Sequence, residues 1–178
     1  MTPERERRID DVKANRQNDL TVIFENLDDP HNISACLRSC DAVGIGEIYI
    51  LSSPSKTNSK LGKKSSASAS KWITIHHFFD LRDCVEAVRR RYSKIYSTRL
   101  TEESVSLYDL NLTESIALVF GNEHSGVSPE MSNLCNGNFL IPQVGMIRSL
   151  NVSVACAVTL YETFRQRMLA DRYPRLIK

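Results

Sequence analysis

The sequence predicts an α/β domain built on a parallel sheet. Short apolar runs rich in β-branched residues alternate with longer segments that have the helical period, which is typical of strand–helix–strand units. The clearest strand candidate, LTVIFE at residues 20–25, is apolar without strict alternation, as expected for a strand covered on both faces. The 178 residues suffice for one domain with a substantial core, so we expect a single domain.

The N-terminal segment, residues 3–18, predicts a short amphipathic helix. Ile9 and Val12 stand among several basic side chains, which would give the helix a basic face. The segment lies before the first strand candidate at residues 20–25. We therefore interpret residues 1–18 as a basic helical arm attached to the core.

A helix and a second strand are predicted after residue 30. Pro30 suits the start of a helix, Asn32 is a good N-cap residue, and Gly44 would end the helix after Val43. EIYIL at residues 47–51 is the next strand candidate. The following residues up to Ser70 are rich in Ser, Lys and Gly and predict a long exposed loop.

The second half of the chain continues the alternation of strands and helices. The helix candidates are FDLRDCVEAVRRRY, PEMSNLCN and a long segment at residues 151–170 whose second half is polar and basic. The strand candidates between them are WITIHHF, KIYST, SIALVF and FLIP.

Composition excludes several classes of protein. No apolar stretch is long enough to span a bilayer, and the charged N-terminus lacks the apolar core of a secretory signal, so we expect a cytoplasmic protein with no membrane partner. The five cysteines are scattered, without a CxxC pair or histidines at zinc-ligand spacing. We expect buried, reduced thiols and no metal.

Three loops are candidates for a ligand site, because ligands of parallel sheets bind beyond the carboxyl ends of the strands. They cover residues 97–100, 121–128 and 142–150. The second loop has Gly121 and Gly126 around polar residues, which permits tight turns and close backbone approach, but it matches neither GxGxxG nor a P-loop. Its ionised group, Glu123, would by itself suit an exposed turn.

The third loop leads into a helix with good N-cap residues, Ser149 and Asn151. A helix N-terminus can hold a carboxylate or a phosphate, although ordinary capping explains the same residues. Near the start of the chain, Asn32 and Arg38 lie six residues apart in a mostly apolar segment. An arginine at a buried edge normally needs an anionic partner, and a structural salt bridge would meet that need equally well.

The combination and order of three segments carry more information than each alone. NISACLRSCDAVG, FGNEHSGVSPE and IPQVGMIRSLNVSVACAV closely resemble the three motifs of the TrmH branch of the SPOUT RNA methyltransferases. The resemblance covers roughly residues 19–168 with matching spacing. It implies a knotted domain over residues 19–168, a basic arm at 1–18 and a short basic tail at 169–178.

The resemblance implies a SPOUT-type fold, in which a parallel sheet flanked by helices ends in a C-terminal deep trefoil knot. It also implies a homodimer through the helices around the knot, and S-adenosylmethionine as the cofactor, held in a bent form by the knot loops. Carried onto this chain, the expected cofactor site consists of Thr98, Gly121, Asn122, Glu123, Gly126, Ile141, Pro142, Met146, Ser149 and Leu150.

The resemblance further implies ribose 2′-O-methylation. It assigns activation of the hydroxyl to Arg38, with Asn32, Ser149 and Asn151 ordering the catalytic site. A ribose hydroxyl is a poor nucleophile that must lose its proton and needs a fixed line of approach. Arginine stays protonated in nearly all protein settings, so Arg38 either acts as an unusual base or holds the phosphate next to the target ribose.

Basic residues near both ends resemble the terminal helices with which relatives hold tRNA, and a lysine-rich stretch at residues 56–71 contains no acidic residue. A solvated loop explains that stretch equally well. The expected RNA-binding residues are Arg5, Arg7, Arg8, Lys13, Arg16, Lys60, Lys63, Lys64, Arg165, Arg167, Arg172 and Arg175.

Within the family, the chain resembles the tRNA guanosine-18 2′-O-methyltransferases, so the substrate implied by the resemblance is guanosine 18 of the tRNA D-loop. Two positions depart from the family pattern: Arg148 replaces a usual Gln, and His124 with Ser125 replaces more typical residues of the second motif. Methylation of another tRNA position or of ribosomal RNA is the first alternative. A catalytically inactive RNA-binding protein is the second, and the joint presence of the motif residues argues against it.

Overall fold

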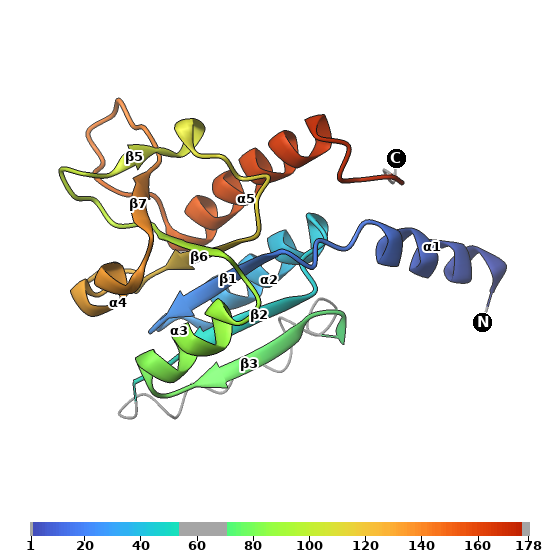
Figure 1. Ribbon diagram of the computed structural model, residues 1–178, viewed down its shortest axis with the longest axis horizontal. Coiled ribbons are helices and arrows are strands. Elements are labelled where there is room, and N and C mark those ends of the chain that lie inside the picture. The colour runs from blue at the N-terminus through green and yellow to red at the C-terminus, as the bar shows by residue number, and fades with distance from the viewer. Residues whose placement is uncertain (1, 54–70, 176–178) are drawn as a thin grey trace.

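The structure, a computed structural model, describes residues 2–53 and 71–175. Within these residues seven strands form one sheet in the order β3-β2-β1-β6-β4-β7-β5, and every strand pairing is parallel (Figure 1). The strands are β1 (Leu20–Glu25), β2 (Glu47–Leu51), β3 (Thr74–Phe78), β4 (Lys94–Ser97), β5 (Val105–Ser106), β6 (Ile116–Phe120) and β7 (Gly137–Leu140). The predicted α/β class with a parallel sheet is confirmed.

Five α-helices and a short 3-10 helix occur in the described residues. They are α1 (Pro3–Ala14), α2 (Pro30–Ala42), α3 (Leu81–Arg89), α4 (Pro129–Leu134), α5 (Val152–Leu169) and the 3-10 helix η3 (Leu107–Asp109). No helix in the described part of the chain is long and apolar enough to cross a membrane.

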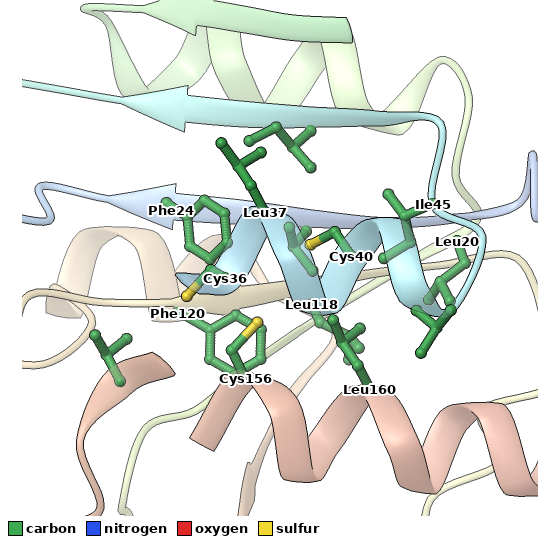
Figure 2. Packing of buried hydrophobic residues seen from close by; sticks show 14 of the residues in the cluster. Leu20, Phe24, Cys36, Leu37, Cys40, Ile45, Leu118, Phe120, Cys156 and Leu160 are labelled. Carbon is green, nitrogen blue, oxygen red and sulfur yellow. The ribbon is translucent and has the colours of Figure 1, made fainter. Parts of the chain in front are cut away.

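Helices α2 and α5 pack together on one face of the sheet. Leu20, Val22 and Phe24 alternate along β1 toward this face, and they share one apolar cluster with residues of both helices. Figure 2 shows Cys36 of α2 and Cys156 of α5 within this packing. Burying each large apolar side chain contributes about 1.5–3 kcal/mol, so this face supplies much of the free energy that holds the two helices in place.

The opposite face of the sheet is covered by α3 and α4. A second apolar cluster there joins Ile23 and Val119 of the central strands to Val88 of α3 and Met131 of α4. The same period of two that directs Leu20 and Phe24 to one face directs Ile23 to the other. Four of the five cysteines are buried and all are free thiols, as predicted, whereas Cys135 is only partly buried.

The structure corrects several predicted boundaries. Asp29, not Asn32, is the N-cap of α2, and its side chain accepts a hydrogen bond from the His31 N–H at 2.8 Å. Helix α1 ends at Ala14 rather than at residue 18. The two-residue strand β5 and the 3-10 helix after it fall in a segment for which no element was predicted.

The two ends of the described chain lie on the same side of the molecule. Figure 1 shows α1 projecting away from the sheet near the C-terminal end, on the side opposite α4. No residue of α1 is buried, so this helix adds nothing to the main core.

Candidate active site

A pocket of about 390 Å³ lies where the loops after β4, β6 and β7 meet the start of α5. This is the carboxyl edge of a parallel sheet, where α/β proteins commonly bind ligands, and the volume falls within the range of small-molecule sites. The lining residues are Thr98, Arg99, Leu100, Phe120, Gly121, Asn122, Glu123, His124, Ser125, Gly126, Val127, Phe139, Leu140, Ile141, Gln143, Arg148, Ser149, Leu150, Val152 and Ala155.

The loop after β6 is folded tightly on itself. Asn122 and Gly126 exchange two backbone hydrogen bonds of 3.1 and 2.9 Å, and Gly126 has a φ of +69°, which glycine adopts without strain. A Cβ atom at Gly121 would lie 2.2 Å from the carbonyl carbon of Gly126 and from the backbone nitrogen of Val127. Glycine at position 121 is therefore required by the loop itself.

The Asn122 side chain holds this loop in shape and ties it to the loop after β1. Its Oδ1 accepts hydrogen bonds from the backbone N–H groups of His124 and Ser125 at 2.9 and 3.1 Å. Its Nδ2 donates to the carbonyl of Asn26 and to the carboxylate of Asp28, both at 2.8 Å. Both ends of the Asn122 amide are therefore engaged within the protein, and its side chain fixes the shape of this loop.

Glu123 connects the pocket to the first turn of α2. Its Oε1 accepts a 2.9 Å hydrogen bond from Asn32 Nδ2, and the N–H groups of Asp28 and Asp29 donate to its two oxygens at 3.1 and 3.3 Å. Partial burial tends to raise the pKa of Glu123, but the hydrogen bonds, led by that from Asn32, outweigh burial and hold its pKa below the usual value. Glu123 is therefore ionised near neutral pH.

The hydrogen-bond network continues to the start of α5, where the loop at residues 142–150 ends. Asn151 donates from Nδ2 to Asn32 Oδ1 at 3.2 Å, and it caps α5 by accepting a 2.8 Å hydrogen bond from the Ser153 N–H. The predicted capping role of Asn151 is confirmed. The chain Glu123, Asn32, Asn151 thus joins residues from all three sequence motifs beside the pocket.

The structure brings most of the expected cofactor residues together. Eight of the ten line the pocket: Thr98, Gly121, Asn122, Glu123, Gly126, Ile141, Ser149 and Leu150. Pro142 and Met146 do not line it, and the Met146 side chain is fully exposed. Thr98 donates its hydroxyl to the carbonyl of Val119 at 3.0 Å, which fixes the start of its loop.

Arg38 does not lie where a buried-edge arginine was predicted. It is exposed on α2, on a stripe with His31, Ala35 and Ala42, and it does not line the pocket of its own chain. Within residues 2–53 and 71–175 its side chain has no ion pair or hydrogen bond, so the structural salt bridge that would also have explained it is absent there.

Sequence reasoning missed several pocket residues, of which Arg99 is the most informative. Its guanidinium donates to the carbonyl of Val127 at 2.9 Å and so ties the loop after β4 to the loop after β6. Arg99 lies in the loop at residues 97–100, which the sequence had already marked as part of a ligand site, and this position could have identified it. Arg148, a departure from the family pattern, lines the pocket with an exposed side chain.

The structure corrects two of the predicted RNA-binding residues. Arg167 is completely buried, and Arg16 is mostly buried and donates to the carbonyls of Ile45 and Trp72, so neither side chain is free to bind RNA. Both were assigned because the basic ends of the chain resemble the terminal helices with which relatives hold tRNA, and that resemblance does not reveal a buried partner. The exposed members are Arg5, Arg7, Arg8, Lys13, Arg165, Arg172 and Arg175, and Lys60, Lys63 and Lys64 lie outside the described residues.

The fold and the pocket define a class of protein: an α/β domain whose parallel sheet has a pocket of small-molecule size at its carboxyl edge. The described part of the chain contains no group of His, Cys, Asp or Glu side chains suited to a metal ion. The family model described as "SpoU rRNA Methylase family" matches residues 19–161, which contain the whole sheet and the pocket. The chain belongs to this family.

Individual relatives match this chain over nearly its full length. The tRNA (guanosine(18)-2′-O)-methyltransferase of Thermus thermophilus is 40% identical over 98% of this chain and 89% of its own. The enzyme of the same description from Escherichia coli K12 is 34% identical over 98% of this chain and 76% of its own. The crystal structure of the TrmH/SpoU tRNA modifying enzyme of Aquifex aeolicus, 36% identical, superposes with a TM-score of 0.86 over 97% of this chain and 87% of its own.

Proposed function

We propose that this protein transfers the methyl group of S-adenosylmethionine to a ribose 2′-hydroxyl of tRNA, and that the target is guanosine 18 in the D-loop. The observation that carries the proposal is the Glu123, Asn32, Asn151 network, which joins the three motifs beside a pocket of cofactor size. Relatives at 34–40% identity over nearly the whole chain are named for this reaction.

S-adenosylmethionine suits the groups that form the pocket. Leu140, Ile141, Leu150 and Val152 offer apolar contact for a flat adenine ring, and the Gly121 loop offers backbone groups for hydrogen bonds. When bound, the cofactor supplies an electrophilic methyl group on a sulfonium. The residues we assign to its site are the eight sequence-predicted residues that line the pocket, and Pro142 and Met146 require a movement of residues 141–150 to reach it.

The protein must fix the ribose hydroxyl and help it lose its proton. Ser149 lines the pocket, and hydrogen bonds link Asn32 and Asn151 to its Glu123. We assign these three residues to orienting the ribose, while Glu123 keeps the Asn32 amide in place. Arg38 stays protonated in nearly all protein settings, so we assign it to the phosphate beside the target ribose, where its charge lowers the pKa of the hydroxyl. Replacing Arg38 with Lys should then keep partial activity, and a variant as inactive as Arg38→Ala would overturn that role.

The position of Arg38 favours a homodimer. Because Arg38 does not line the pocket of its own chain, we propose that two subunits pack through the helices around the proposed knot, and that each pocket is completed by the partner's Arg38. Exposed apolar side chains at Val144, Met146, Ile147 and Val154 support an interface there.

We propose the same three-part organisation that the sequence predicts, with an arm at 1–18, a knotted domain at 19–168 and a tail at 169–178. The sheet order is consistent with a trefoil knot, since β4 precedes β6 and β7 in the chain but lies between them in the sheet. The exposed basic residues of the arm and tail would contact tRNA phosphates, and we place the enzyme in the cytoplasm, where tRNA is modified.

The direct test is to incubate the protein with labelled S-adenosylmethionine and with either unmodified tRNA or ribosomal RNA. Incorporation into tRNA alone supports the proposal, and incorporation into ribosomal RNA alone selects the alternative substrate. Cofactor binding measured by calorimetry separates an enzyme from an inactive RNA-binding protein, since a pure RNA binder need not hold S-adenosylmethionine.

A further inference from the structure

Two arginines line the pocket without an acidic partner. Arg99 lies in the loop after β4, and Arg148 lies in the loop between β7 and α5. Neither guanidinium forms an ion pair within residues 2–53 and 71–175. A guanidinium is planar and can donate two parallel hydrogen bonds to one carboxylate or phosphate. The catalytic proposal assigns no role to either arginine.

Arg99 is fixed in the pocket wall with most of its donors free. Its side chain is half-buried, and one guanidinium nitrogen donates to the carbonyl of Val127 at 2.9 Å. In the described part of the chain this is its only side-chain hydrogen bond, although a guanidinium has five N–H donors. Because the bond to Val127 already restricts the side chain, a ligand that binds Arg99 pays little further cost in conformational entropy.

Arg148 brings a second positive charge to the same pocket from another loop. Its side chain is exposed, and it forms no hydrogen bond to the residues that the structure describes. The next two residues, Ser149 and Leu150, also line the pocket. Two loops far apart in sequence therefore place two guanidinium groups at one cavity of about 390 Å³.

The acidic side chain of the pocket does not neutralise these arginines. Among the described residues that line it, Glu123 alone is acidic. Its carboxylate accepts its hydrogen bonds from the Asn32 amide and from two backbone N–H groups, and from neither arginine. The lining thus has an excess of positive charge, which attracts an anionic group and repels a cationic one.

S-adenosylmethionine carries one anionic group, the carboxylate of its methionine part. Its sulfonium and its amino group are both positive, so the two arginines oppose binding of the cofactor unless they meet that carboxylate. An RNA phosphate is the other anion that the proposed reaction brings to the site. The half-buried position of Arg99 favours the carboxylate, because a group that reaches Arg99 has to enter the pocket, as a small molecule does.

We propose that Arg99 and Arg148 bind the carboxylate of S-adenosylmethionine and make it a determinant of cofactor affinity. This inference rests on the proposed function and deepens it, because it adds two cofactor-binding residues outside the set that the sequence predicts. It also assigns the methionine part of the cofactor to the side of the pocket where the loops after β4 and β7 contribute these side chains.

The test measures, by calorimetry and without RNA, how the protein binds S-adenosylmethionine and decarboxylated S-adenosylmethionine. The second compound keeps the sulfonium and the amino group and lacks only the carboxylate. We expect the native protein to bind S-adenosylmethionine about tenfold or more tightly than the decarboxylated compound, because hydrogen bonds between charged groups are strong. Arg99→Gln and Arg148→Gln should each lose most of this preference, through weaker binding of S-adenosylmethionine alone.

Arg82→Gln is the matched control, because it removes an exposed, unpaired arginine of α3 that does not line the pocket. It should keep the native preference. Arg148 is exposed, so Arg148→Gln keeps the inference testable if Arg99→Gln does not fold. A folded variant of either arginine that retains the native preference would overturn the inference, and a higher KM for tRNA in that variant would assign the arginine to an RNA phosphate.

The native protein separates this inference from the proposed function. Equal affinity for the two compounds would overturn the inference and leave S-adenosylmethionine as the cofactor. A native protein that binds neither compound would refute the proposed function itself, and the inference with it.

Discussion

At the scale of single residues, Glu123 is the residue that organises the site. Replacing Glu123 with Gln leaves one acceptor oxygen in place of two and removes the charge that attracts three N–H donors. Hydrogen bonds to a charged group contribute about 1.5–3 kcal/mol, so we expect kcat/KM for tRNA to fall by about ten- to a hundredfold. Steady-state methylation assays measure this, with Glu102→Gln, an exposed carboxylate, as the control. Equal activity of the two variants would show that the network is dispensable.

The contacts of the Glu47 carboxylate predict how the stability of the protein depends on pH. Its carboxylate accepts hydrogen bonds from Tyr92 at 2.7 Å and Tyr49 at 3.1 Å, and it lies 2.8 Å from Arg91 and 3.2 Å from His76 Nε2. Burial tends to raise the pKa of Glu47, but these contacts, led by the Tyr92 hydroxyl, outweigh burial and hold its pKa below the usual value. Because the pKa of Glu47 is lower in the folded protein than in the unfolded chain, its carboxylate stabilises the fold at pH values above the pKa of the unfolded chain. This stabilisation is lost as the pH falls through the pKa of the folded protein.

We therefore expect the free energy of unfolding, measured with urea, to decrease between pH 6 and pH 3.5. Glu47→Gln should be less stable at pH 6 and should show a smaller decrease over the same range. A variant whose stability changes with pH as steeply as that of the native protein would contradict this role of Glu47.

At the scale of elements, two glycines from different loops provide a test and its control: Gly121 after β6 lines the pocket, and Gly46 before β2 does not. Gly121→Ala would place a Cβ 2.2 Å from backbone atoms of Gly126 and Val127, whereas a Cβ at Gly46 has only the Arg16 side chain near it, at 3.7 Å. We expect Gly121→Ala to abolish measurable binding of S-adenosylmethionine by calorimetry, and Gly46→Ala to bind it as the native protein does. Similar affinities in the two variants would place the cofactor away from this loop.

The elements also show what sequence can and cannot predict. The central strands and α5 follow from apolar patterning, because burial on both faces leaves a clear record in the sequence. The cap of α2 was assigned to Asn32 although Asp29 fills it, since both residue types cap helices and only the backbone path selects between them. The loops that form the pocket were recognised, but their contacts were not, because Asn32 and Glu123 meet across 91 residues.

Arg167 shows that the sequence does not reveal whether a basic residue is exposed or buried. The sequence shows a basic segment, and a basic segment normally faces solvent. Here the partners of Arg167 come from Gln17, Asp19 and the carbonyls of a loop before β6, none of which is close in sequence. The three-dimensional arrangement turns a predicted RNA contact into a buried structural residue.

At the scale of the whole molecule, the proposed dimer predicts complementation between two inactive variants. Gly121→Ala removes the cofactor site, and Arg38→Ala removes the proposed phosphate contact. In a mixed dimer, the intact pocket of the Arg38→Ala subunit would receive Arg38 from the partner subunit. Mixing the variants under conditions that exchange subunits should therefore restore about a quarter of native activity, from random pairing with one working site per mixed dimer. No recovery would show that each pocket needs the Arg38 of its own chain.

The central claim concerns one hydroxyl group of one RNA. Unmodified tRNA should be incubated with the protein and labelled S-adenosylmethionine, and the modified ribose should then be mapped at single-nucleotide resolution. The structure and its relatives predict a 2′-O-methyl group at guanosine 18 and at no other position. Methylation of a different tRNA nucleotide, or of ribosomal RNA with none in tRNA, would contradict the proposed function.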